Sequence, residues 1–324
     1  MKRRDFIALA GAATVVGARP AKAEDFPSRP VKIVVPVSTG GATDQLARFL
    51  AQKLGERLHG SVYVENKTGA GSIIGTSYVQ KSPPDGYTLL MGGIFNMVMI
   101  TALMKDPPFD PPRDFAAVGY LAAYPFVVIV RADLPVNSLS EFAAYAKAHQ
   151  GKMNYASGGL GTLQHVWGTV LLRSMGLNLL HVPYKGATPA LQDMIAGRID
   201  FMFDNLAACR GAIDAGQVKA LAVSSAERTR PLPKVPTVDE SGVAKFDGES
   251  WFGLFAPAGT PGGVVDQLRR QVAAITTEPE FIQRVERNAG RVLAIDPDKQ
   301  EQFLKGELDR WSALITRYQV SAEQ

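Results

Sequence analysis

The stretches Phe126-Val127-Val128-Ile129-Val130 and Trp251-Phe252-Gly253-Leu254-Phe255-Ala256 are the two apolar segments that decide the fold. Each is a short, nearly uninterrupted apolar run, which is typical of a strand buried on both faces of a sheet. Residues 126–250, from the first segment up to the second, hold a complete set of strand and helix patterns of their own. We therefore expect one lobe to be inserted into another, with the chain crossing between them twice and forming a hinge.

The rest of the chain alternates apolar runs with amphipathic ones, which indicates strands joined by crossover helices in a mostly parallel α/β sheet. We assign residues 24–125 and 251–324 to lobe 1 and residues 126–250 to lobe 2. The segment 106–112 is rich in proline and aspartate, so we expect it to run extended over the surface. Other strands are predicted at residues 31–35, 62–64, 87–91, 153–156, 199–203 and 220–223.

The first 23 residues resemble a removable export signal. Basic residues Lys2-Arg3-Arg4 precede a mildly apolar run, and Ala21-Lys22-Ala23 supplies small residues around a cleavage site. The Arg3-Arg4 pair fits a twin-arginine signal, with the general secretory route as the alternative. The apolar run is shorter than the roughly 20 residues that a spanning helix needs. We therefore expect cleavage after Ala23 and release of a soluble mature protein.

Charge and cysteine content exclude several classes of protein. Residues 1–23 carry five of the 35 Lys and Arg residues and one of the 31 Asp and Glu residues, so 30 of each sign remain in the mature chain. A neutral chain lacks the basic surface of a nucleic-acid binder. Cys209 is the only cysteine, which excludes an internal disulfide.

Two glycine-rich loops, one in each lobe, are the predicted anion-binding elements. Each follows a strand and opens a helix, where free backbone N–H groups and the positive end of the helix dipole favour an anion. Facing each other, the two loops would hold a carboxylate; the alternative is that each is a tight turn with a helix cap. The candidate ligand-binding residues are Ser38, Thr39, Gly40, Gly41 and Thr43 in the first loop and Ser157, Gly158, Gly161 and Thr162 in the second.

Two further residues are candidates for contact with the ligand. Asp204 follows an apolar strand and emerges at its carboxyl end, where open α/β sheets bind ligands; capping of the next helix is the alternative. His165 lies in the first turn of the helix after the second glycine loop, where it either touches a ligand or makes a structural hydrogen bond.

Motifs of enzymes and cofactor sites are missing from the sequence. There is no H-E-x-x-H, G-x-S-x-G or P-loop motif. The glycines from Gly69 to Gly75 resemble a dinucleotide fingerprint, but their spacing is one residue too long. The four histidines are scattered along the chain. We therefore predict a binding protein rather than an enzyme, with no cofactor and no bound metal.

Motifs along nearly the whole mature sequence make the chain similar to the Bug-type (TctC-like) receptors of tripartite tricarboxylate transporters. No single motif is specific, but their joint order is. They include Pro27-Ser28-Arg29-Pro30-Val31, Gly40-Gly41-Ala42-Thr43-Asp44, Pro84-Asp85-Gly86-Tyr87-Thr88-Leu89-Leu90, Asn154-Tyr155-Ala156-Ser157, His181-Val182-Pro183-Tyr184-Lys185-Gly186 and Leu232-Pro233-Lys234-Val235-Pro236-Thr237.

The resemblance implies a periplasmic, monomeric binding protein of two α/β lobes that captures a small organic carboxylate and delivers it to transporter membrane subunits. It also implies that the carboxylate is held mainly by backbone amides of the two glycine loops and by bridging waters, with Asp204 lining the same cleft. Val37-Ser38-Thr39 departs from the usual first loop, and Leu160 and Leu163 make the second loop more apolar. These departures favour an aromatic or less polar carboxylate. The alternative function is ligand sensing for a periplasmic sensor kinase.

Overall fold

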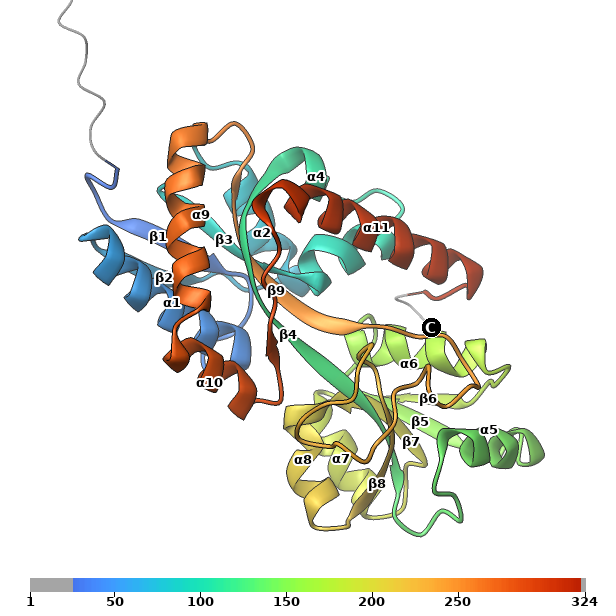
Figure 1. The fold of residues 1–324 in the computed structure, drawn as a ribbon. Coiled ribbons are helices and arrows are strands. Elements are labelled where there is room, and N and C mark those ends of the chain that lie inside the picture. Colours follow the sequence, from blue (N-terminus) through green and yellow to red (C-terminus); the bar gives the residue numbers. More distant parts are fainter. Residues whose placement is uncertain (1–25, 322–324) are drawn as a thin grey trace, which may run out of the picture.

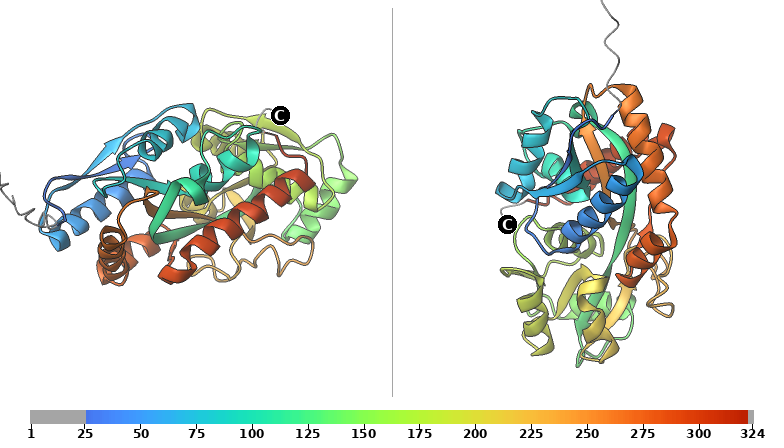
Figure 2. Two further views of the ribbon diagram at one scale, coloured as in Figure 1. Left: turned by 90° about the horizontal axis from the view of Figure 1, so that it is seen from above. Right: turned by 90° about the vertical axis from the view of Figure 1, so that its left-hand side faces the viewer.

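The computed structural model describes residues 26–321 and shows a two-lobed α/β molecule (Figure 1). The predicted leader and its cleavage site lie outside the described residues. One lobe is built on the sheet that contains β1, β2 and β3, and the other on the sheet that contains β5, β6 and β7. Views along two other directions show helices on both faces of the sheets (Figure 2).

The sheet of lobe 1 has the order β2-β1-β3-β9-β4. Its outer pairs, β1 with β2 and β1 with β3, are parallel, whereas β9 pairs antiparallel with β3 and β4. The short strand β10 also pairs with β4. The strands are β1 (Val31–Val35), β2 (Val62–Asn66), β3 (Thr88–Gly93), β4 (Phe115–Arg131), β9 (Glu249–Pro257) and β10 (Arg291–Val292).

The sheet of lobe 2 continues from the far half of β4 in the order β4-β7-β5-β6, and β8 pairs with the same half of β4. Pairs β5–β6 and β5–β7 are parallel, and β4 is antiparallel to β7 and β8. These strands are β5 (Asn154–Ser157), β6 (Leu180–Pro183), β7 (Phe201–Asn205) and β8 (Val218–Val223). The parallel pairs thus lie at the outside of each lobe, and the antiparallel pairs lie along the strands that connect them.

Strand β4 is the element that the two lobes share. The apolar run at residues 126–130 is confirmed as a strand, but the strand begins at Phe115, inside the region that the sequence assigned to lobe 1. Its first half pairs with β9 and its second half with β7 and β8. Apart from Ala116 and Arg131, all its residues are buried. The alternation that marks a half-buried strand is therefore absent.

Helices cover both faces of each sheet. In lobe 1, α1, α9 and α10 pack on one face through residues such as Leu50, Leu268 and Phe281. In lobe 2, α7 and α8 cover the face of β4 that carries Val127 and Ile129, and α5 and α6 cover the other face. The bounds are α1 (Ala42–Leu58), η1 (Ala70–Ser72), α2 (Ile73–Gln80), η2 (Phe95–Met99), α3 (Ile100–Leu103), α5 (Leu139–Ala148), α6 (Leu163–Ser174), α7 (Ala187–Ile195), α8 (Leu206–Asp214), α9 (Gly262–Thr276), α10 (Pro279–Arg287) and η3 (Pro297–Lys299).

One local prediction was wrong at its end. Residues 106–110 lie outside any helix, as predicted, but Pro111 and Pro112 begin the short helix α4 (Pro111–Asp114). Proline is tolerated in the first turn, where its missing N–H has no intrahelical partner to lose. The carboxylate of Asp114 also accepts a hydrogen bond from the backbone N–H of Asp110 at 2.8 Å, which closes the turn.

The last helix, α11 (Gln300–Arg317), contacts both lobes. Trp251 of β9 donates a hydrogen bond from Nε1 to the Glu307 carboxylate at 2.9 Å. Trp311 stacks on Trp167 of α6, with ring centroids 5.1 Å apart and planes inclined by 14°. Figure 1 shows α11 reaching from the first lobe towards α6. The helix therefore forms a further contact between the lobes besides the strand crossings.

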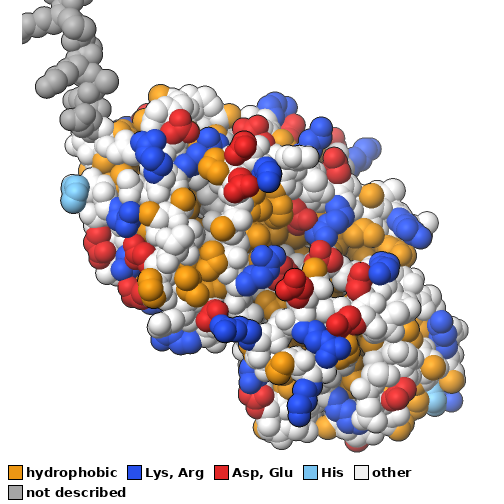
Figure 3. Space-filling model, viewed as in Figure 1, with side chains coloured by type: hydrophobic (Ala, Val, Ile, Leu, Met, Phe, Trp, Pro, Cys, Tyr) orange, Lys and Arg blue, Asp and Glu red, His pale blue; other side chains and the backbone are white. Residues whose placement is uncertain are grey.

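Charges of both signs are interspersed on the face shown in Figure 3, with no large area of a single sign. One exposed ion pair joins Arg230 of lobe 2 to Glu286 of lobe 1 at 2.7 Å. Within residues 26–321, no helix is both long and apolar enough to cross a membrane.

The stack between α6 and α11 leads to a stability prediction. Trp167 and Trp311 are both fully buried, so truncation at either leaves a large cavity. We expect Trp311→Ala to lower the free energy of unfolding by about 3–5 kcal/mol, as measured by urea denaturation. Tyr63→Ala is the control, because Tyr63 is 46% exposed and its truncation is expected to cost much less. Equal losses in the two variants would show that α11 does not stabilise the fold through this stack.

Candidate functional site

A cavity of about 330 Å³ lies between the two lobes, and we call it the interlobe cavity. Its size is that of a site for a small organic molecule. Lobe 1 and the strands that connect the lobes supply Pro36, Val37, Thr43, Ser72, Met91, Gly93, Ile94, Phe95, Asn96, Phe126, Ser250 and Phe252. Lobe 2 supplies Thr162, Leu163 and Gln164. The cavity thus meets the first turns of α1 and α6.

The first turn of α1 presents uncapped backbone donors. The N-cap residue, Gly41, has no side chain to accept a hydrogen bond, and the N–H groups of the next three residues have no intrahelical acceptor. Thr43 lies in this turn and lines the cavity. Ser38, Thr39, Gly40 and Gly41 are exposed in the loop before it and are not among the lining residues. The loop thus lies between a strand and a helix as predicted, and one of its five candidate residues, Thr43, lines the cavity.

Asp44 holds the first loop in place. Its carboxylate accepts hydrogen bonds from Gly40 N (2.9 Å), Arg48 Nε (2.9 Å) and Asn66 Nδ2 (2.9 Å). Burial opposes ionisation of this side chain, but these three donors together hold the pKa of Asp44 below its ordinary value. Gly40 has φ = +91°, a conformation that favours glycine. The first loop is thus held by the buried Asp44 carboxylate, whose oxygens accept hydrogen bonds from other groups of the protein.

The second loop is held by its own side chains. Thr162 caps α6, and its Oγ1 donates to Gly159 O at 2.7 Å. Ser157 is buried, and its Oγ lies 2.8 Å from His181 Nε2. Gly158 N donates to Gln164 Oε1 at 3.3 Å. Of the second-loop candidates, only Thr162 lines the interlobe cavity.

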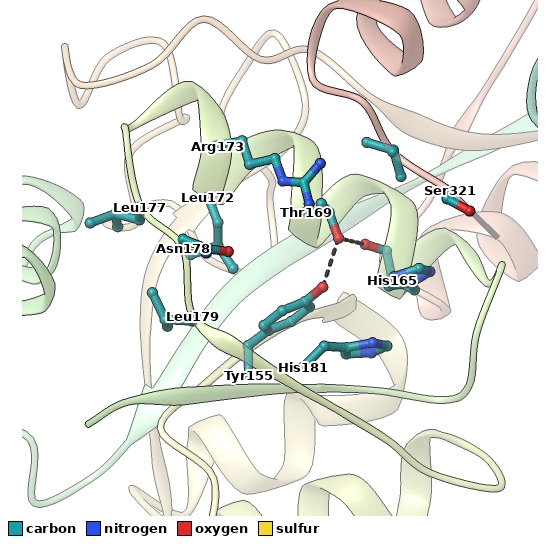
Figure 4. Close-up of a pocket in the computed structure, with 11 residues that line it drawn as sticks. Tyr155, His165, Thr169, Leu172, Arg173, Leu177, Asn178, Leu179, His181 and Ser321 are labelled. Carbon is teal, nitrogen blue, oxygen red and sulfur yellow. Dashed lines mark hydrogen bonds between the residues drawn. The ribbon is translucent and has the colours of Figure 1, made fainter. Parts of the chain in front are cut away.

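His165 is turned away from the interlobe cavity. Its Nδ1 accepts a hydrogen bond from Gly161 N at 3.1 Å, and its ring stacks on His181 with centroids 4.3 Å apart. Figure 4 shows both rings beside Tyr155 in a second, smaller pocket of about 120 Å³. The structure therefore matches the alternative in which His165 makes a structural hydrogen bond.

Asp204 lies behind the cavity wall, with only 1% of its surface exposed. Its Oδ1 accepts hydrogen bonds from Gln164 Nε2 (2.6 Å) and Asn205 N (2.7 Å). Oδ2 is buried and has no hydrogen-bond partner among the described residues. Burial raises the pKa of Asp204 above its ordinary value. Asn205, rather than Asp204, caps α8 through a bond from Ala207 N at 3.0 Å.

Several wall residues were missed or left undecided by sequence reasoning. Phe95 and Phe252 both line the cavity, although an aromatic residue in such a position fits a core as well as a cleft wall. Pro36, Met91 and Ile94 gave no signal, because an apolar residue at a strand end looks the same whether it faces a core or a ligand. Within residues 26–321, no group of three or more His, Cys, Asp or Glu side chains is placed to hold a metal ion.

Comparison with known proteins identifies the family. Residues 46–320 match the family described as "Tripartite tricarboxylate transporter family receptor". The chain is 36% identical, over 100% of its length and 96% of the relative's, to the "UPF0065 protein in tcbD-tcbE intergenic region" of Pseudomonas sp. strain P51.

Three solved structures resemble the fold. A protein of R. palustris with adipate has a TM-score of 0.79 at 32% identity, covering 92% of this chain and 99% of that one. The periplasmic binding protein BugD scores 0.76 at 37% identity, covering 91% and 99%. MatC from Rhodopseudomonas palustris with bound malate scores 0.76 at 32% identity, covering 90% and 100%. With its two lobes and an interlobe cavity lined by two helix starts, the chain belongs to the tripartite tricarboxylate transporter receptor family.

Proposed function

We propose that this protein captures a small organic carboxylate in the interlobe cavity and delivers it to the membrane subunits of a tripartite transporter. The observation that carries the proposal is the convergence of the α1 and α6 first turns on one cavity, with Thr43 on one side and Thr162 on the other. Two related receptors hold carboxylates, adipate in one case and malate in the other.

In this proposal, the carboxylate is bound by backbone N–H groups and not by a cation. The lining residues include no lysine, arginine or histidine. The free N–H groups of two helix starts and the positive ends of their dipoles supply the favourable potential instead. Side chains of the two glycine loops shape these turns: Asp44 holds the first, and Ser157 and His165 hold the second.

Export completes the proposed function. Residues 1–23 act as a twin-arginine signal that is cleaved after Ala23, and the mature protein works as a monomer in the periplasm. The support is the sequence of the leader together with similarity to a periplasmic binding protein. N-terminal sequencing of the exported protein tests the cleavage site.

Ligand-dependent stabilisation tests the whole proposal. A carboxylate that binds only the folded protein at 100 times its Kd adds about 2.7 kcal/mol to the free energy of unfolding. Thermal-shift measurements on the mature protein should therefore show an increase in Tm with mono-, di-, tri- or aromatic carboxylates. The matched amides, which lack the negative charge, should cause no increase. If no carboxylate raises Tm, the proposal is wrong.

A substitution at the N-cap of α1 tests the backbone anchor. In Gly41→Asp, the new carboxylate accepts from the first-turn N–H groups and occupies the place of the ligand anion. We expect at least a tenfold loss of carboxylate affinity by calorimetry. Gly41→Ala is the matched control, because a Cβ at this position meets no atom within 4 Å and the φ of −73° suits alanine. Similar affinities in both variants would show that α1 does not anchor the ligand.

We further propose that Asp204 acts through Gln164 rather than on the ligand. The unfolded chain loses the Asp204 proton near the ordinary pKa, whereas the folded protein keeps it to higher pH. The contribution of Asp204 to the free energy of unfolding therefore falls as pH rises from the ordinary pKa of Asp204 through its raised pKa. Asparagine does not titrate. Measured from pH 4 to pH 8, the free energy of unfolding of Asp204→Asn should therefore increase relative to that of the wild type as pH rises.

Binding measurements on two variants separate the roles of Asp204. Asparagine keeps an oxygen that accepts from Gln164, so Asp204→Asn should bind the carboxylate within a few-fold of the wild type. Asp204→Leu releases Gln164 and should weaken binding several-fold more. If both variants lose affinity equally for an amino acid but not for a plain acid, Asp204 contacts the ligand directly.

A further inference from the structure

The wall of the interlobe cavity is mostly apolar. Val37, Met91, Ile94 and Phe95 come from lobe 1, Phe252 from β9 and Leu163 from α6. Phe95 and Leu163 are both half-buried in the structure, so part of each side chain is available to a ligand. These side chains give the body of a ligand apolar surface to contact from both lobes.

Charge is missing from the same wall. None of the residues that line this cavity is Asp, Glu, Lys, Arg or His. Charged side chains close to the lining are engaged elsewhere: Asp44 pairs with Arg48, Glu249 accepts from Arg291, and Asp204 accepts from Gln164 behind the wall. No ionised side chain therefore meets a ligand in this cavity.

The two amide side chains in the lining are already hydrogen-bonded by the protein. Asn96 is buried, its Oδ1 accepts from Gly93 N at 2.9 Å, and its Nδ2 donates to Thr76 Oγ1 at 3.0 Å. The amide of Gln164 is likewise held between Asp204 and Gly158. The remaining donors in the lining are the hydroxyls of Ser72 and Ser250 and the backbone N–H groups of the helix starts beside Thr43 and Thr162. At α6 one of these N–H groups, that of His165, already donates to Thr162 Oγ1.

The positions of the backbone donors and of the apolar side chains determine which parts of a ligand the cavity can bind. One carboxylate finds backbone donors at the helix starts, and an apolar body finds apolar walls. A second carboxylate directed at the wall around Phe95 would lose its hydration and would find no cation there, only the hydroxyls of Ser72 and Ser250, which is unfavourable. An apolar group in the same place gains from leaving water.

We propose that the ligand of this receptor is a monocarboxylate with an apolar body, either an aromatic ring or a hydrocarbon chain, and that the wall around Phe95 and Phe252 discriminates against a second carboxylate. This inference rests on the proposed function of the same cavity and narrows its ligand class. It also separates this chain from its R. palustris relative, whose structure contains the dicarboxylate adipate.

Matched pairs of acids test the inference on the wild-type mature protein. Hexanoate and adipate share a six-carbon chain and differ in the second carboxylate; benzoate and terephthalate are the corresponding ring pair. Calorimetry should show the monocarboxylate of a pair binding at least tenfold more tightly than its dicarboxylate. A dicarboxylate that binds as tightly as its partner, or more tightly, overturns the inference and leaves the proposed carboxylate function intact.

The remaining outcomes are also decisive. If neither hexanoate nor benzoate binds while another carboxylate in the wider panel raises Tm, the apolar ligand class is wrong but the carboxylate function stands. If no carboxylate of any kind binds, both proposals fail together.

A charge substitution in the wall gives a second readout. Phe95→Lys places a cation at the apolar end, so the hexanoate-to-adipate affinity ratio should fall at least tenfold from that of the wild type. Leu180→Lys is the matched control: Leu180 is 71% exposed on β6 and does not line the cavity, so the ratio should not change. An unchanged ratio in a folded Phe95→Lys protein, checked by circular dichroism, contradicts the proposed wall. If that variant does not fold, the wild-type pairs decide.

Discussion

Strand β4 changes its hydrogen-bonding partners at Pro125 and Phe126, and the rest of the architecture depends on this change. Proline has no N–H to donate there. Phe126 N donates to Ser224 Oγ at 2.8 Å, and Ser224 N donates back to Phe126 O at 2.9 Å. The same hydroxyl donates to Gly248 O. Ser224 thus joins the crossing strand to the chain that leads back into β9. Because the strand continues unbroken into both sheets, it sets the position of one lobe relative to the other.

The position of the lobes in turn determines the chemistry of the site. Helices α1 and α6 begin after β1 and β5, at the carboxyl ends of parallel strands, where open α/β sheets bind ligands. The shared strand brings the two helix starts to one cavity. A site made of backbone donors needs no buried cation, whose desolvation would be costly. Side chains such as the buried Asp44 and the half-buried Gln164 then serve mainly to hold the loops that present these donors.

Local patterns were enough to predict some elements and not others. The run at residues 126–130 and the two glycine loops are evident because strand hydrophobicity and helix caps are short-range features. The first half of β4 contains Ala, Gly and Tyr without alternation, and it is a strand only because β9 pairs with it. The directions of His165 and Asp204 depend on neighbours distant in sequence, respectively the stack on His181 and the bond from Gln164. Helix α11 was expected in lobe 1, and its contact with α6 through Trp311 has no local signal.

A backbone anchor separates the binding of the carboxylate from the recognition of the rest of the ligand, which a side-chain anchor would combine. Backbone N–H groups at a helix start are present whatever the side chains are, so the fold alone can supply the grip on a carboxylate. The side chains of the wall then determine which ligand fits the cavity once its carboxylate is bound. Two relatives at 32% identity contain different acids, adipate and malate, within similar folds. In the site that we propose for this chain, the corresponding choice would fall to the uncharged side chains around Phe95, Leu163 and Phe252, whose chemistry matches hydrocarbon rather than a second anion.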